Sequence, residues 1–96
     1  MTRYTVIWLE AALEELAEVW MNTVDRDGVT TAAHVVDREL AEDPDQKGVE
    51  KDPGIRRLTV SPLLVLYTVR EPDRIVEVTS VKLSAAEASG NGAPLP

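Results

Sequence analysis

A short alternating segment opens the chain. Tyr4, Val6 and Trp8 alternate with Thr5 and Ile7. β-Branched and aromatic residues with a period of two are typical of a strand that is buried on one face. We therefore expect residues 4–9 to form a β-strand.

The spacing of apolar residues then changes to steps of three and four, which is typical of one face of an α-helix. The predicted buried stripe of this first helix is Leu9, Ala12, Leu13, Leu16, Val19 and Trp20, with glutamates at 10, 14, 15 and 18 on the other side. After the break DRDG, Thr30 or Thr31 can cap a second helix. Its predicted stripe is Ala32, Ala33, Val36 and Leu40. Pro44 disfavours helical geometry in Asp43, so the second helix ends there and the two helices form an antiparallel hairpin.

The second half of the chain contains three apolar segments. Residues 43–54 hold two Asp-Pro pairs and two glycines, and we expect a loop there. Three strands are predicted next, at Ile55–Val60, Leu63–Arg70 and Arg74–Leu83. Val78 and Val81 would fall on opposite faces of a regular strand, so a β-bulge is predicted near Thr79–Ser80.

These elements predict one α+β domain over residues 1–83, because a chain of 96 residues is too short to bury two cores. The element order is β-α-α-β-β-β. We expect a four-stranded, mainly antiparallel sheet with the helical hairpin on one face. Residues 84–96 lack periodicity and are expected to form a disordered tail.

The strand at residues 63–70 is apolar on both faces. Leu63, Val65 and Tyr67 are the natural side for the helices, which leaves Leu64 and Leu66 pointing away from them. An exposed apolar patch is a solubility liability and often marks an interaction site. Either the neighbouring strands bury these leucines, or they are covered by a partner protein, a second copy of the chain or its own tail.

Composition excludes several classes of function. The chain has no cysteine and one histidine, so it offers no thiolate or histidine metal cluster, and we expect no cofactor. Neither a secretory signal nor a membrane span is present, which favours a cytoplasmic protein. The net charge of −7 argues against general nucleic-acid affinity, and most of the acidic residues lie before residue 55.

The order and spacing of the segments YTVIW, AALEELAEVW, IRRLTVSPLLVLYTV and RIVEVTSV resemble those of the RelE/ParE superfamily of type II toxin–antitoxin systems, also called plasmid stabilisation proteins. The resemblance covers about residues 4–83. It implies a toxin that is neutralised by a cognate antitoxin.

The family implies two activities. RelE-like members cut mRNA on the ribosome with basic and aromatic residues on the open face of the sheet, whereas ParE-like members inhibit DNA gyrase. Of the positions that carry the nuclease residues, only Arg57 keeps a basic side chain, and Leu64 stands where the family has an arginine. At the end of the last strand Leu83 and Ser84 replace a basic pair, with Lys82 nearby.

Three hypotheses follow. The first is a toxin that acts by binding a protein target such as gyrase. The second is a ribosome-dependent mRNA endonuclease in which Arg57 is the catalytic candidate, and the third is a non-toxic scaffold that keeps the fold. A homodimer is a further alternative for the covered patch, and the candidate residues for binding an antitoxin or another partner are Arg56, Arg57, Leu64, Leu66 and Lys82.

Overall fold

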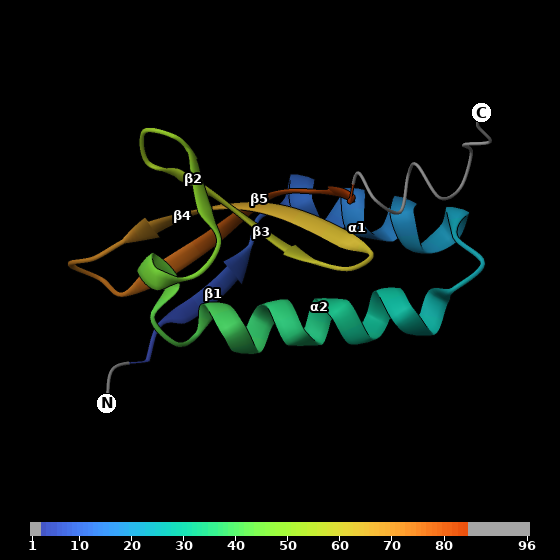
Figure 1. The fold of residues 1–96 in the computed structure, drawn as a ribbon, viewed down its shortest axis with the longest axis horizontal. Coiled ribbons are helices and arrows are strands. Elements are labelled where there is room, and N and C mark those ends of the chain that lie inside the picture. The colour runs from blue at the N-terminus through green and yellow to red at the C-terminus, as the bar shows by residue number, and fades with distance from the viewer. Residues whose placement is uncertain (1–2, 85–96) are drawn as a thin grey trace.

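A mixed β-sheet and two helices form the protein, and the computed structural model describes residues 3–84. The elements are β1 (Thr5–Trp8), α1 (Glu10–Asn22), α2 (Arg26–Leu40), a 3₁₀ turn (Pro44–Gln46), β2 (Val49–Asp52), β3 (Ile55–Val60), β4 (Leu63–Arg70) and β5 (Ile75–Leu83). The strand order across the sheet is β1-β5-β4-β3-β2. β1 pairs with β5 in parallel, and the other pairs are antiparallel. Figure 1 shows α2 running along the molecule, with α1 beside the C-terminal end of β5.

The predicted α+β class and element order are confirmed, but the sheet has five strands instead of four. The additional strand is β2, which lies in the segment expected to be a loop. Gly48 has a φ of +63°, and a Cβ at this position would clash with the backbone oxygen of Arg57. This close approach lets the chain turn onto the edge of β3 and pair Val49 with Arg57. All four residues of β2 are exposed, so no apolar alternation marked the strand in the sequence.

The second helix begins earlier than the threonine caps predicted. Asp25 is the N-cap, and its carboxylate accepts a hydrogen bond of 3.0 Å from the N–H of Gly28. Aspartate caps a helix as well as threonine does, because its oxygen satisfies a free donor of the first turn. The segment DRDG is therefore the start of α2, and only Thr23–Asp25 separate the two helices.

The core lies between the helices and one face of the sheet. Its fully buried large side chains on helices and strands come from α2, β4 and β5: Val29, Val36, Leu40, Leu63, Val65, Tyr67, Val76, Val78 and Val81. Both Val78 and Val81 face this core because the pairing with β4 shifts between Leu66↔Ser80 and Tyr67↔Val78. The extra residue is Thr79, which confirms the predicted bulge.

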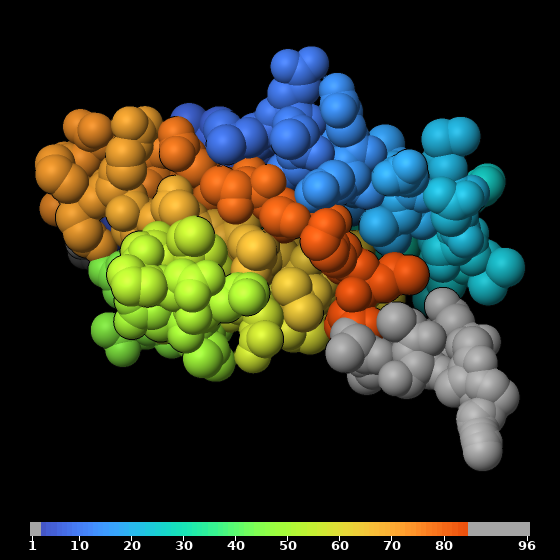
Figure 2. Space-filling model, turned by 90° about the horizontal axis from the view of Figure 1, so that it is seen from above, coloured from blue at the N-terminus to red at the C-terminus, as the bar shows by residue number. Residues whose placement is uncertain are grey.

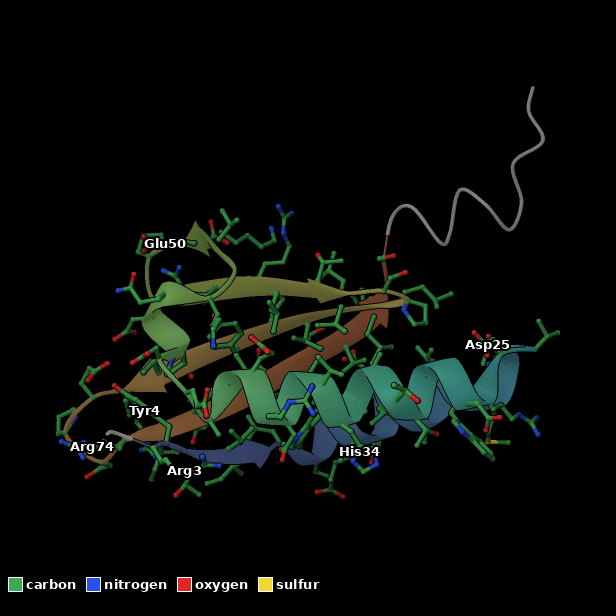
Figure 3. All side chains as sticks on the ribbon, turned by 60° about the horizontal axis from the view of Figure 1, so that its bottom comes forward. Arg3, Tyr4, Asp25, His34, Glu50 and Arg74 are labelled. Atoms are coloured by element: carbon green, nitrogen blue, oxygen red, sulfur yellow. The ribbon has the colours of Figure 1, made fainter. Side chains whose placement is uncertain are left out.

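The end of the molecule near the N-terminus is tied together by polar contacts. The Tyr4 hydroxyl donates to the two Glu71 carboxylate oxygens at 2.9 and 3.0 Å, which links the chain before β1 to the turn between β4 and β5. Figure 3 shows Tyr4 and Arg74 in this corner. At the other end of the sheet, the N–H of Ser84 donates to the Pro62 carbonyl at 2.9 Å. The rest of the tail expected at residues 84–96 lies outside the described residues.

Candidate functional site

The open face of the sheet, opposite the helices, carries four of the five candidate residues. Register places Leu66 of β4 beside Arg57 of β3, and Leu64 between Thr59 of β3 and Lys82 of β5. We call Arg57, Leu64, Leu66 and Lys82 the open-face patch. In the view of Figure 2, β5 runs between α1 and β2.

Leu64 and Leu66 are half-buried, whereas the alternate residues Leu63, Val65 and Tyr67 are fully buried. The alternation follows from strand geometry, in which successive side chains point to opposite faces. Cross-strand neighbours on β3 and β5 flank both leucines. The apolar part of the patch is therefore less exposed than the uncovered surface described in the sequence hypothesis.

The cations near the patch differ in their partners. Lys82 Nζ lies 3.7 Å from Glu15 Oε2, and Arg70 Nη2 lies 3.3 Å from Glu77 Oε2. Arg57 is exposed, and within residues 3–84 it forms no ion pair. The patch thus presents one unpaired guanidinium beside two leucines.

Arg56 lies on the opposite face of β3 and has a structural environment. Its Nε donates to the Lys47 carbonyl at 3.0 Å and its Nη2 to the Gly48 carbonyl at 3.3 Å. The hydroxyl of Tyr67 lies 2.7 Å from the same Lys47 carbonyl, and burial raises the pKa of this phenol. Lys47 in turn donates from Nζ to the carbonyls of Glu39 and Glu42, the former in the last turn of α2. Arg56 therefore helps to hold the loop before β2 against the sheet.

The edge of β5 beyond β1 is covered by α1. The N–H of Val81 donates to Glu15 Oε1 at 2.8 Å. This backbone hydrogen bond is the main cause that lowers the pKa of Glu15, with smaller contributions from Ser80 and Lys82. A carboxylate on α1 thus satisfies a strand donor that has no β1 partner.

A second apolar surface, which the sequence interpretation missed, lies between the two helices. Leu13, Trp20 and Met21 of α1 are 49%, 38% and 66% exposed. With α2 they form a groove of about 480 Å³, lined by Leu13, Leu16, Ala17, Trp20, Met21, Val29, Thr30, Ala33 and His34. We call this the hairpin groove, and Figure 3 shows one of its lining residues, His34, on α2. Leu13 and Trp20 were predicted to lie in the buried stripe of the first helix. In the structure, the fully buried residue of α1 is Ala12 instead.

Metal-ligand clusters and membrane-spanning helices are both absent from residues 3–84. No group of three His, Asp or Glu side chains within residues 3–84 converges as metal ligands would. Neither α1 nor α2 combines the length and apolarity that a membrane-crossing helix needs.

A comparison with protein families shows to which family the chain belongs. The family model described as the ParE toxin of the type II toxin–antitoxin system parDE matches residues 6–85. The chain belongs to the ParE toxin family. This confirms the predicted relationship to the RelE/ParE superfamily. No curated protein is significantly similar to the chain.

Solved structures share the fold of this ParE-family chain at low sequence identity. The RelBE2 toxin–antitoxin complex from Mycobacterium tuberculosis has a TM-score of 0.70 at 17% identity, and the match covers 88% of this chain and 95% of that chain. The chromosomal ParDE system from P. aeruginosa has a TM-score of 0.61 at 15% identity, with coverage of 84% and 96%. The archaeal RelE–RelB complex from Pyrococcus horikoshii has a TM-score of 0.63 at 15% identity, with coverage of 88% and 98%.

Proposed function

We propose that this ParE-family toxin acts by binding a protein target through the open-face patch, and that a cognate antitoxin neutralises it. The observation that carries the proposal is that two half-buried leucines lie on that face beside Arg57, whose guanidinium forms no ion pair within residues 3–84. Apolar side chains around a single arginine are typical of protein interfaces.

Among residues 3–84, the same face offers few of the groups that RNA cleavage uses. Binding an RNA backbone draws on several clustered cations, and proton transfer needs a group with a suitable pKa close to the reacting oxygen. Lys82 and Arg70 are engaged by Glu15 and Glu77, and His34 lies on α2. These contacts support a binding function over a nuclease.

The matched solved structures support the proposal that a cognate antitoxin binds this toxin. The matched structures from M. tuberculosis and P. horikoshii are described as complexes of a toxin with its antitoxin or of RelE with RelB. An antitoxin that covers the open-face patch would block access to the target.

Two alternatives make different predictions. Arg57 is free enough to contact a phosphate, which favours a ribosome-dependent mRNA endonuclease as the second candidate. A scaffold that has lost toxicity is the third.

Regulated expression in a bacterial host without an antitoxin distinguishes these functions. We expect growth arrest with intact mRNA and altered plasmid supercoiling, because the ParE resemblance implies gyrase as the target. The double variant Leu64→Gln/Leu66→Gln should relieve the arrest, whereas Glu50→Gln on the exposed strand β2 should not. Cleaved mRNA that becomes intact in Arg57→Ala would establish the nuclease instead. Harmless expression of the folded wild-type chain would contradict both toxic functions.

A further inference from the structure

The open-face patch has a regular layout that the strand register fixes. On one row across the sheet, Val49 of β2, Arg57 of β3 and Leu66 of β4 lie side by side. On the next row, Leu64 of β4 lies beside Lys82 of β5. Residues paired directly across strands point to the same face of the sheet. The two cations therefore stand at opposite corners of the patch, with the two leucines between them.

The guanidinium of Arg57 has apolar neighbours on both sides. Val49 is 59% exposed, and Leu66 is half-buried. A carboxylate that bound Arg57 between these side chains would be partly shielded from water, which strengthens an ion pair. An arginine also holds a carboxylate through two parallel hydrogen bonds. The surroundings of Arg57 thus favour a carboxylate as its partner.

The second cation of the patch, Lys82, is held loosely. Its Nζ lies 3.7 Å from Glu15 Oε2, and its side chain is 66% exposed. Glu15 has a stronger partner in the N–H of Val81, which donates to Oε1 at 2.8 Å. Because an exposed ion pair contributes little to stability, Lys82 can turn to an incoming carboxylate while Glu15 keeps its hydrogen bond to Val81.

The charges around the patch are balanced except at one position. Arg70 lies 3.3 Å from Glu77 across β4 and β5, and Lys82 is paired with Glu15. Arg57 has no ion pair within residues 3–84. In a chain whose net charge is −7, this face therefore offers a cation that a negatively charged partner can use.

The spacing of the two cations matches the spacing of side chains on a helix. Neighbouring strands lie about 4.8 Å apart and a strand advances about 3.4 Å per residue, so the register places the α-carbons of Arg57 and Lys82 about 12 Å apart. Residues i and i+7 of a helix are about 10 Å apart and share a face with residues i+3 and i+4. Acids at i and i+7 can thus reach both corners while apolar residues between them cover the leucines.

We propose that the open-face patch binds an acidic amphipathic helix of the toxin's protein target. One carboxylate of this helix binds Arg57, a second binds Lys82, and its apolar side chains pack on Leu64 and Leu66. The inference rests on the proposed function and deepens it, because it states the chemistry of the target surface that the patch recognises. Packing of an amphipathic helix by its apolar stripe is a common mode of recognition, and the flanking charges select the partner.

The charges disfavour the other occupants of this face. Binding to RNA draws on several clustered cations, whereas the patch has two and the chain is strongly acidic. A second copy of the chain has the same net charge of −7, which opposes its approach. Residues 85–96 have one charged side chain, Glu87, and so cannot supply two side-chain carboxylates.

Two synthetic helical peptides of about 15 residues test the proposal, since shorter helices are marginal in water. One carries glutamates at positions i and i+7 and leucines at i+3 and i+4. The other has the same composition, but both glutamates are moved to the opposite face of the helix. Fluorescence anisotropy with the full chain should show saturable binding of the first peptide, and binding of the second should be weaker on the order of tenfold. Equal binding of both peptides would overturn the proposal.

Single substitutions test which cations hold the first peptide. Arg57→Ala should weaken its binding on the order of tenfold, and Arg57→Lys should restore part of it, because an ammonium keeps the charge without the two parallel hydrogen bonds. Lys82→Ala should weaken it less, since Lys82 must also leave Glu15. Arg38→Ala on α2 removes the same charge elsewhere and should change the affinity less than about twofold.

The controls establish that such losses are specific. Arg38 and Arg57 are both exposed, so the thermal unfolding temperatures of their alanine variants should stay close to wild type. Equal weakening by Arg38→Ala and Arg57→Ala would mean unspecific attraction and would overturn the proposal. A labelled single-stranded RNA that binds more tightly than the acidic peptide, and is released by Arg57→Ala, would overturn it in favour of the nuclease. Self-association of the wild-type chain that Arg57→Ala removes would identify a second copy as the occupant instead.

The remaining outcomes separate this inference from the proposed function. A toxic chain whose growth arrest is relieved by Leu64→Gln/Leu66→Gln, but that fails to bind the acidic peptide, would refute the acidic helix and leave the function intact. A harmless chain that binds the acidic peptide with the expected dependence on Arg57 would support the chemistry of the patch and refute the toxin.

Discussion

The two apolar surfaces of this toxin differ in how far the fold itself covers them. On the open face of the sheet, Leu64 and Leu66 are half-buried between neighbouring strands, and the cations of the patch are Arg57 and Lys82, of which Lys82 is paired with Glu15. In the hairpin groove, Leu13 and Met21 are about half exposed or more, and the border is acidic. The open face therefore leaves only part of its apolar surface free, whereas the hairpin groove leaves apolar side chains of α1 exposed beside carboxylates.

The largest expected effect separates the two faces of β4. Leu63→Ala should lower the free energy of unfolding by about 3 kcal/mol, because the side chain is fully buried and its removal leaves a cavity. The adjacent Leu64→Ala should cost about 1 kcal/mol, since only part of the apolar surface of Leu64 is buried. Urea denaturation of both variants measures the difference. Equal costs would show that Leu64 belongs to the core and would remove it from the open-face patch.

The next largest effect concerns the strand that the sequence did not reveal. Gly48→Ala should cost about 2 kcal/mol, because the residue has a positive φ and its Cβ would clash with the Arg57 backbone oxygen. Gly54→Ala is the matched control. Gly54 also has a positive φ, of +83°, but a Cβ there would meet no atom within 4 Å. A cost at Gly48 no larger than that at Gly54 would contradict the close approach of the loop to β3.

The contrast between β4 and β2 shows what sequence patterns can predict. The alternation in residues 63–70 and the conflict between Val78 and Val81 correctly indicated the inner face of β4 and the bulge at Thr79. Both depend on burial, which leaves an apolar period in the sequence. β2 is exposed at all four residues and depends on Gly48, so it left no such period.

The candidate surfaces were predictable to different degrees for the same reason. The alternation of side chains along the strand placed Leu64 and Leu66 on the face opposite the helices, and the structure agrees. The hairpin groove was missed because the apolar positions of α1 form a stripe wider than its contact with the sheet. Ala12 takes the buried centre, which leaves Leu13 and Trp20 at the side. Only the angle at which α1 packs on β5 decides this, and that angle is a tertiary property.

A smaller effect tests how α1 protects the sheet edge. Glu15→Ala should cost about 1–2 kcal/mol, because it leaves the Val81 N–H without its acceptor. Glu15→Gln keeps an acceptor oxygen and should cost less. Thermal unfolding at neutral pH compares the three proteins, and identical stabilities would contradict the hydrogen bond.

The same contact predicts a pH dependence. Because the folded state lowers the pKa of Glu15 below its ordinary value of 4.5, the ionised carboxylate stabilises the fold. Its contribution should be complete above about pH 4.5 and lost as the pH falls through the lowered pKa of the folded state. The stability difference between wild type and Glu15→Gln should therefore shrink on acidification. A difference that is constant from neutral pH to pH 3 or so would show that the carboxylate gains nothing from Val81.

The smallest expected effect separates two adjacent arginines. Arg56→Ala should cost about 1 kcal/mol, because it removes the hydrogen bonds to the Lys47 and Gly48 carbonyls. Arg57→Ala should change the stability by no more than about 0.5 kcal/mol, since the side chain is exposed and has no ion pair within residues 3–84. Chemical denaturation of the two variants, with Arg57→Lys as a control that keeps the charge, measures both values. If the Arg57→Ala variant is as stable as wild type but no longer arrests growth, Arg57 belongs to the surface that contacts the target. If the variant is strongly destabilised, Arg57 has a role in the fold, and its assignment to the open-face patch is wrong.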